Sequence, residues 1–244
     1  MNIKTQHRII EIANWVARKS PLLKKAIKPI YYPIKQHWKS QRNKQYRENG
    51  LRALKDFTTC LETNGYHYTL AFGTMLGAVR EKGFIKHDLD IDVYLWIDEW
   101  DKLMEKFLNR EGFVLDHKFL IEDGRLGREE TYIRDGVSID IFYIYPPIDK
   151  LPYCCDFACW KDVASYRLCN IKYGGTLPRR IELPYSKDRV KTDFEDTKLF
   201  IQANSVELLK CRYGESFMTP DPTWHNGDNV HIIPWQEKLG VYYD

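Results

Sequence analysis

A short acidic stretch, HDLDIDV at residues 87–93, constrains this chain more than any other part of its sequence. Its charged and apolar residues alternate, and successive side chains of a strand point to opposite faces. The pattern therefore predicts a strand with Asp88, Asp90 and Asp92 on one face. Three such carboxylates repel one another unless a cation lies among them, and Mg²⁺ or Mn²⁺ binds oxygen ligands of this kind. The alternative is a solvated acidic edge strand, but the apolar run YLW at 94–96 favours a buried central strand.

Two further features favour a site for a cation and a phosphate. Asp140 lies alone in the apolar stretch IDIF at 139–142, and a buried carboxylate is costly unless it is paired or binds a metal. A hydrogen-bonded core Asp is the alternative. Gly73 and Thr74 stand between a predicted strand and a predicted helix, where backbone N–H groups can bind phosphate. A Gly-Thr pair is weak evidence alone, but the combination with the acidic stretch is specific.

The spacing of apolar residues predicts alternating helices and short strands. Helices are expected at about 45–64, 73–80, 98–110 and 203–213, and strands at about 66–72, 90–96, 113–120, 131–135 and 137–145. Residues 150–195 give no clear pattern, and the tail from Pro220 is expected to be a loop. This order predicts an α+β fold, with α/β as the alternative, that has a small mixed β-sheet flanked by helices.

Positive charge is concentrated at the N-terminus. Residues 1–50 contain twelve Lys or Arg and two Glu, whereas the whole chain has a net charge of +3. We therefore expect a basic, amphipathic helical arm over residues 1–44 and a mildly acidic catalytic domain over 45–244. The arm carries apolar residues and Trp15, which favours binding of residues 1–40 to an anionic membrane surface. A helix packed on the body or a poorly ordered tail is the alternative, and no nucleic acid is expected as a partner.

The remaining composition excludes several classes of protein. With 43% hydrophobic and 14% aromatic residues the chain can form a core, so disorder of the whole is excluded. No transmembrane helix and no secretion signal are expected, which predicts a cytoplasmic protein. Binding of the basic arm to lipid would make it peripheral on the inner membrane face. Six cysteines without regular spacing indicate reduced thiols, and Cys154, Cys155 and Cys159 lack the paired spacing of a zinc site.

The central motifs resemble those of the LicD family, which has the nucleotidyltransferase fold and is related to the fukutin-type proteins. Residues 73–80 read GTMLGAVR, 83–85 read GFI and 88–92 read DLDID, in the order found in that family. The stretch YGESFMTP at 213–220 is similar to the Tyr-Gly signature of the family. The resemblance covers roughly residues 50–220 and leaves the basic arm outside.

Two positions depart from the family pattern. Leu89 stands where the family has the middle one of three consecutive Asp residues, and strand alternation predicts that it points away from the site. His87 stands where the family usually has an aromatic residue, so it fills the same space or contacts the substrate. The sequence leaves open whether His87 or Asp88 contacts the substrate.

The resemblance implies metal-dependent transfer of a phospho-alcohol, such as phosphocholine, from a CDP-activated donor to a glycan hydroxyl. The acceptor would be a cell-surface or lipid-linked glycan, as in capsule or lipopolysaccharide synthesis. Asp90, Asp92 and Asp140 would bind Mg²⁺ or Mn²⁺ against the pyrophosphate of the CDP-alcohol. Asp140 would also accept the proton of the acceptor hydroxyl.

The resemblance also implies a phosphate-binding role for the GTMLGAVR stretch. Gly73 and Thr74 would cradle a phosphate of the donor, and Arg80 would stabilise charge on the transferred phosphoryl group. A surface ion pair is the alternative for Arg80.

Two other functions stay open at this point. The chain can be a nucleotidyltransferase that modifies a small molecule, or a catalytically inactive scaffold of the same fold. The complete set of carboxylates argues against the scaffold. The sequence does not identify the alcohol of the donor, the acceptor sugar or the oligomeric state.

Overall fold

The computed structural model describes residues 21–86, 88–163, 165–221 and 231–244, in part by the backbone alone between 21 and 31. The α-helices are α2 (Pro21–Thr63), α3 (Phe72–Arg80), α4 (Leu103–Arg110), α5 (Tyr166–Tyr173) and α6 (Ser205–Tyr213). The strands are β1 (Thr69–Leu70), β2 (Ile91–Trp96), β3 (Val114–Ile121), β4 (Gly127–Arg134), β5 (Val137–Ile144), β6 (Tyr153–Ala158), β7 (Leu177–Glu182), β8 (Arg189–Phe194), β9 (Thr197–Gln202), β10 (Ile232–Pro234) and β11 (Val241–Tyr243).

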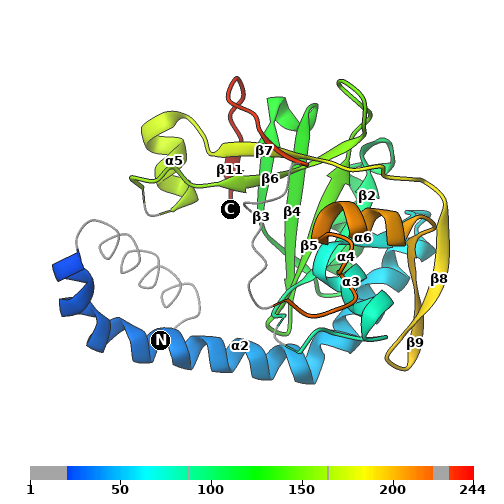
Figure 1. Ribbon diagram of the computed structural model, residues 1–244, viewed down its shortest axis with the longest axis horizontal. Helices are drawn as coiled ribbons and strands as arrows, with labels where there is room; N and C mark the ends of the chain where they lie inside the picture. The colour runs from blue at the N-terminus through cyan, green and yellow to red at the C-terminus, as the bar shows by residue number, and fades with distance from the viewer. Residues whose placement is uncertain (1–20, 87, 164, 222–230) are drawn as a thin grey trace.

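A six-stranded sheet in the order β1-β2-β5-β4-β3-β11 lies at the centre of the molecule (Figure 1). β2 and β5 are parallel, and the other neighbours in this sheet are antiparallel. A three-stranded sheet, β10-β7-β6, and the β8–β9 hairpin accompany it. The sheet is therefore mixed and flanked by helices, which confirms the α+β fold with a nucleotidyltransferase-like mixed sheet.

One face of the central sheet packs on the C-terminal half of α2 and on α4. Leu54, Phe57 and Leu61 of α2 recur at three- and four-residue steps, and each is at most 1% exposed. The ring of Phe57 packs edge-on against Phe113 with centroids 5.0 Å apart. Burial of each such side chain contributes about 1.5–3 kcal/mol, so this face is the hydrophobic core that fixes α2 on the sheet.

The opposite face is partly covered by the beginning of α3 and by β6. Phe72 packs edge-on against Tyr94 of β2 and Phe142 of β5, with centroids 5.1 and 4.8 Å apart. Phe119 of β3 stacks on Phe157 of β6 at 4.7 Å. The part of this face beyond the aromatic residues carries the polar side chains of the candidate site.

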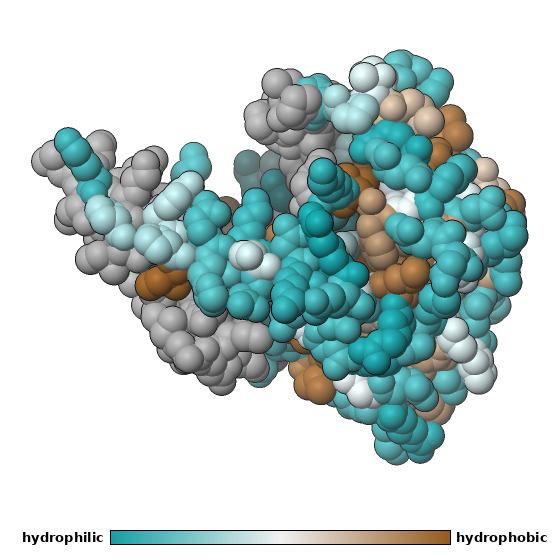
Figure 2. Space-filling view, turned by 90° about the horizontal axis from the view of Figure 1, so that it is seen from below, coloured by the Kyte–Doolittle hydropathy of each residue, from teal (hydrophilic) through white to brown (hydrophobic). Residues whose placement is uncertain are grey.

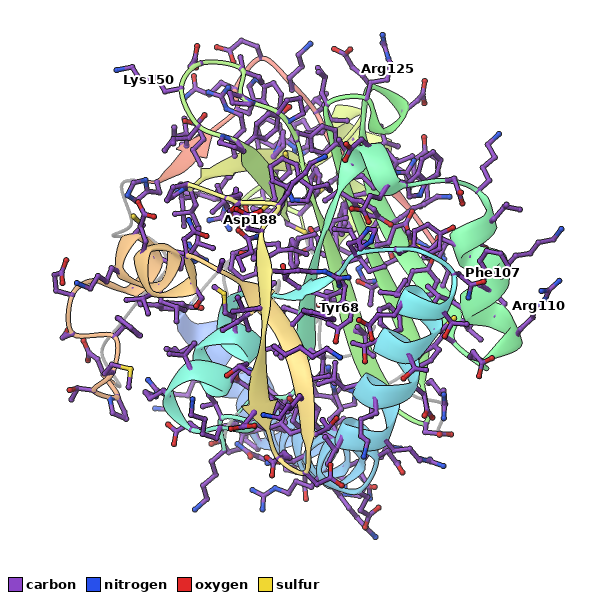
Figure 3. The ribbon with its side chains drawn as sticks, turned by 90° about the vertical axis from the view of Figure 1, so that its right-hand side faces the viewer. Tyr68, Phe107, Arg110, Arg125, Lys150 and Asp188 are labelled. Atoms are coloured by element: carbon purple, nitrogen blue, oxygen red, sulfur yellow. The ribbon has the colours of Figure 1, made fainter. Side chains whose placement is uncertain are left out.

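The β8–β9 hairpin closes one side of the molecule, with Tyr68 beneath it (Figure 3). The hydroxyl of Tyr68 accepts a hydrogen bond from the N–H of Phe200 at 3.5 Å. At the hairpin turn, the Glu195 carboxylate accepts from the N–H of Phe84 at 3.1 Å, and the Glu195 N–H donates to the Lys82 carbonyl at 2.7 Å. The hairpin thereby fixes the loop between α3 and the acidic stretch.

α2 is a single helix of 43 residues that runs along one side of the body and projects beyond it (Figure 1). Its described surface is largely hydrophilic when seen from below (Figure 2). The expected boundary between residues 44 and 45 lies inside this helix, and the division into an arm and a catalytic domain stays a prediction. Residues 1–20, with Trp15, lie outside the described residues. Within the described ranges, no helix combines the length and the apolar character needed to cross a membrane.

Several elements differ from the sequence-based expectations. Residues 150–195 contain β6, α5 and β7, and the tail expected to be a loop contributes β10 and β11. These short strands depend on pairing with distant segments, as Tyr242 does opposite Phe119, and a local pattern carries no sign of such pairing. The strand expected at 66–72 is reduced to β1, because α3 already begins at Phe72.

Candidate active site

Asp92 and Asp140 lie side by side on neighbouring strands. They are partners in the parallel pairing of β2 with β5, so both carboxylates leave the same face of the sheet. Both side chains are partly buried. The two aspartates that the sequence analysis assigned to one site are therefore adjacent in the structure.

Asp88 and Asp90 lie outside the strand, which corrects the expected strand with three carboxylates. β2 begins at Ile91, and residues 88–90 form an irregular segment before it. Asp90 is exposed and Asp88 is partly buried. His87 lies outside the described residues.

Side chains of α2 explain why this segment leaves the sheet. Arg42 donates from Nη2 to the carbonyl of Leu89 at 3.0 Å, and the Tyr46 hydroxyl donates to the carbonyl of Asp90 at 3.0 Å. Two carbonyls that could accept hydrogen bonds from a partner strand thus accept them from side chains of α2. Burial raises the pKa of the Tyr46 hydroxyl, and the charges of Asp88, Asp90 and Asp92 raise it further, so the phenol stays a donor at neutral pH.

The Gly-Thr turn lies beside these carboxylates. A Cβ atom at Gly73 would be 2.9 Å from Oδ2 of Asp88, so a larger residue here would displace the Asp88 carboxylate. Oγ1 of Thr74 accepts a hydrogen bond from the N–H of Asp92 at 2.9 Å. The beginning of α3, with the positive end of its dipole, therefore faces the acidic residues.

Crowding of negative charge perturbs the two strand carboxylates. Burial raises the pKa of Asp92 well above its usual range, and the charges of Asp90, Asp140 and Asp88 raise it further. Burial also raises the pKa of Asp140 to about 6; a hydrogen bond from Thr131 opposes this shift, and the charge of Asp90 adds to it. Ionisation of both carboxylates is therefore unfavourable in the empty site, and a bound cation would favour their charged forms.

The chemistry of this donor set fits a hard divalent cation. Asp92 and Asp140 offer adjacent carboxylate oxygens, and Mg²⁺ typically combines one or two carboxylates with water and substrate phosphates. The described side chains do not by themselves gather three ligands around one point. Asp92 and Asp140 are therefore the first ligands to consider, with the exposed Asp90 beside them.

Arg80 lies at the opposite end of α3 from Gly73. Its Nε donates to Oε1 of Glu81 at 2.8 Å, and its Nη1 donates to the carbonyl of Phe217 at 3.3 Å. The Arg80 side chain is only 10% exposed. The structure brings Gly73 and Thr74 to the carboxylates and engages Arg80 in these other contacts, so a phosphoryl-binding role for Arg80 stays a prediction.

Sequence analysis missed Arg42 and Glu129. The positive charge of Arg42 lowers the pKa of Asp140, which places this α2 residue next to the site. Glu129 of β4 lies opposite Phe142 on the same face of the sheet. Burial raises the pKa of Glu129, and the charges of Asp140 and Asp156 add to the effect. Neither residue belongs to a recognisable motif.

The Tyr-Gly motif also reaches the site. Burial raises the pKa of Tyr213 above its usual range; Arg212 opposes the shift, and the charges of Asp92 and Asp88 add to it. The guanidinium of Arg212 lies 5.1 Å from the ring centroid of Phe72. The end of α6 therefore packs beside the beginning of α3.

The cysteines of β6 belong to the core. Cys154 and Cys155 are buried free thiols, and burial raises the pKa of Cys154 to about 12. Such thiols stay protonated at neutral pH and are poor nucleophiles and metal ligands.

Comparison with known proteins identifies the fold of the central region. Residues 65–151 match the profile of the LicD/FKTN/FKRP nucleotidyltransferase domain. The chain is 25% identical over 212 residues to the ribitol-5-phosphate transferase FKTN of Mus musculus, and 23% identical to that of Homo sapiens. Each of these matches covers 81% of this chain and 41% of the relative.

A bacterial relative has a higher sequence identity over a shorter region. The lipopolysaccharide cholinephosphotransferase LicD of Haemophilus influenzae is 42% identical over 125 residues, which cover 41% of this chain and 47% of that protein. The chain thus spans less than half the length of each relative. The carboxylates Asp88, Asp90, Asp92 and Asp140, and the Gly73–Thr74 turn, all lie within residues 65–151. Residues 65–151 therefore match the nucleotidyltransferase domain of the LicD family, which confirms the resemblance predicted from the sequence.

Proposed function

We propose that this protein transfers a phospho-alcohol from a CDP-activated donor to a hydroxyl of a cell-surface or lipid-linked glycan, with Mg²⁺ or Mn²⁺. The observation that carries the proposal is the pairing of Asp92 with Asp140 beside the beginning of α3. The names of the relatives support the class of reaction, because one is a ribitol-5-phosphate transferase and another a lipopolysaccharide cholinephosphotransferase.

Each residue of the site has a defined part in this proposal. Asp92 and Asp140, with Asp90, hold the cation, which when bound neutralises charge on the donor pyrophosphate and on the departing CMP. The backbone N–H groups at Gly73 and Thr74 bind a donor phosphate at the positive end of α3. Asp140 also accepts the proton of the acceptor hydroxyl, because its carboxylate leaves the sheet on the same face as Asp92 and lies beside the donor.

The exposed basic residues of α2 support a membrane-associated location. Lys25, Lys39, Lys44 and Arg47 are exposed on this helix, and each basic residue near an anionic lipid surface contributes about 1 kcal/mol to binding. We propose that the protein is cytoplasmic and binds the inner membrane face through residues 1–40, where lipid-linked glycans would be accessible to it.

The deciding experiment measures CMP release. Purified protein is incubated with Mg²⁺ or Mn²⁺, a glycan acceptor, and CDP-ribitol, CDP-choline, CDP-ethanolamine or CDP-glycerol in turn. We expect CMP from one donor class and none with EDTA. Pyrophosphate release from a nucleoside triphosphate would instead indicate a nucleotidyltransferase that modifies a small molecule, and absence of both products would indicate an inactive scaffold.

A further inference from the structure

A β-bulge in β3 turns one histidine toward the candidate active site. Leu115 pairs with Tyr132 and His117 pairs with Thr131, so the register between β3 and β4 shifts at Asp116. In an unbroken strand Leu115 and His117 would share a face, because side chains two residues apart point the same way. The extra residue puts them on opposite faces, and bulges re-aim side chains in this way next to active sites.

The re-aimed histidine continues the row of polar residues that contains Asp140. Asp140 of β5 pairs with Thr131 of β4, and Thr131 pairs with His117 of β3. The three strands are neighbours in the sheet (Figure 1), and residues paired across antiparallel strands point to the same face. Asp92, Asp140, Thr131 and His117 therefore form one line across four strands.

Hydrogen bonds connect this line. Nδ1 of His117 lies 3.0 Å from Oδ2 of Asp116, and Nε2 of His117 lies 3.2 Å from Oγ1 of Thr131. Thr131 is the direct pairing partner of Asp140, so its hydroxyl lies beside the carboxylate on the same face, and a hydrogen bond from Thr131 lowers the pKa of Asp140. Thr131 is 3% exposed, so its single hydroxyl proton has few other acceptors.

The direction of these hydrogen bonds follows from the single proton of the Thr131 hydroxyl. When the hydroxyl donates to Asp140, its oxygen can only accept, so Nε2 of His117 must donate to it. The other ring nitrogen, Nδ1, faces Asp116. Glu129 of β4 is a further acidic residue on this face of the sheet. The ring centroid of Tyr242 of β11 lies 5.5 Å from that of His117.

We propose that His117 is a positioning residue for Asp140, which it orients through the hydroxyl of Thr131. His117 holds the Thr131 proton toward Asp140, and this bond fixes the carboxylate oxygens for the cation. The inference rests on the proposed function, because it assigns Asp140 to the cation site. Partners of this kind, one bond removed from a metal ligand, typically change metal affinity or activity about 10- to 100-fold.

Two substitutions separate this role from simple packing. The His117 ring lies 5.5 Å from the rings of both Phe119 and Tyr242, so a merely structural role would depend on an aromatic ring. His117→Phe keeps the ring and removes the donor. His117→Gln removes the ring and keeps an N–H donor at the position of Nε2.

The experiment measures Mn²⁺ affinity by titration, together with kcat and KM for CMP release, in the full-length protein. His117→Phe and Thr131→Val should each weaken Mn²⁺ binding about 10-fold or more and lower kcat, while KM for the donor changes less. The double variant should be no weaker than either single variant, because both remove one chain of bonds. His117→Gln and Thr131→Ser should restore affinity, and the exposed His67→Phe should change nothing.

The outcomes distinguish this inference from the proposed function. Unchanged Mn²⁺ affinity in His117→Phe, additive losses in the double variant, or equal losses in His117→Gln and His117→Phe would each overturn the positioning role. A wild-type protein that shows the expected pattern of Mn²⁺ affinities but releases no CMP from any donor would overturn the proposed function alone.

Discussion

The N–H of Asp92 donates to Oγ1 of Thr74 at 2.9 Å, so the hydroxyl at the beginning of α3 fixes the strand that carries the carboxylate. Thr74 is 4% exposed. The threonine of the Gly-Thr turn therefore connects helix and strand, so the phosphate contact proposed for this turn would come from its backbone.

Removal of this hydroxyl should cost both stability and activity. Thr74→Val keeps the shape of the side chain but leaves the N–H of Asp92 without its acceptor, which costs about 1–3 kcal/mol. We expect a lower free energy of unfolding in urea and a lower rate of CMP release. Thr74→Ser keeps the acceptor and is the matched control; equal losses in the two variants would contradict this role.

Asp140→Asn should lower turnover by orders of magnitude while the protein stays folded. The amide supplies less charge to a cation and cannot accept a proton from the acceptor hydroxyl. Steady-state CMP release checks the loss, and circular dichroism checks the fold. Asp123→Asn is the control, because Asp123 is an exposed turn residue with φ of 56°, a conformation that Asn also adopts. Normal turnover in folded Asp140→Asn would contradict the assignment of Asp140.

The stability of the cation-free protein should depend on pH through Asp140. Its pKa is raised to about 6 in the folded state and is about 3.9 in an unfolded chain. Between these values the folded state binds more protons, so this group lowers the free energy of unfolding as pH rises from about 4 to 6. In EDTA, Asp140→Asn should therefore raise Tm relative to wild type by more at pH 7 than at pH 5. Equal differences in Tm at both pH values would contradict the raised pKa of Asp140.

A buried ion pair on the core face should be essential for stability. Nη1 of Arg128 donates to Oε1 of Glu130 at 2.5 Å, and both side chains are 5% exposed. Arg128→Met leaves a buried charge unpaired, which costs about 3–5 kcal/mol. Arg125→Met breaks the exposed pair with Glu122 and should cost less than about 1 kcal/mol. Urea unfolding of both variants tests the contrast, and equal costs would contradict it.

The exposed basic residues of α2 should bind anionic membranes in a salt-dependent way. Replacement of the exposed Lys25, Lys39 and Lys44 by Gln should weaken binding to phosphatidylserine liposomes by about 1 kcal/mol per residue. The same change at Lys102, Lys150 and Lys161, which are exposed on the body, should have a smaller effect. Co-sedimentation at low and high salt measures both. Wild-type protein that stays in the supernatant at low salt would exclude the membrane proposal.

Local patterns predicted the parts of the fold that depend on local spacing. The apolar face of α2, the strands β2 and β5, and the single carboxylate of β5 follow from periodicity within a few residues. The sequence analysis assigned Asp92 and Asp140 to one cation site, and the structure places them opposite each other on neighbouring strands.

The residues that sequence analysis missed depend on contacts between distant segments. Arg42 and Tyr46 act on Leu89 and Asp90 because α2 passes beside the acidic stretch, and strand alternation alone placed Asp88 and Asp90 on β2 incorrectly. His117 faces the site because of a one-residue bulge, and a bulge leaves no mark on alternation until the partner strand is known.

The continuity of α2 makes this helix a lever. At about 1.5 Å per residue, a helix of 43 residues is about 64 Å long, and the two prolines inside it, Pro29 and Pro33, lie near its beginning. The exposed basic residues that precede Arg42 are joined by helix, instead of a flexible linker, to the middle of α2, which holds the Asp88–Asp90 segment through Arg42 and Tyr46. On the proposed function, a surface bound by these basic residues would therefore set the height and tilt of the candidate site above it, and with them the acceptor hydroxyls within reach.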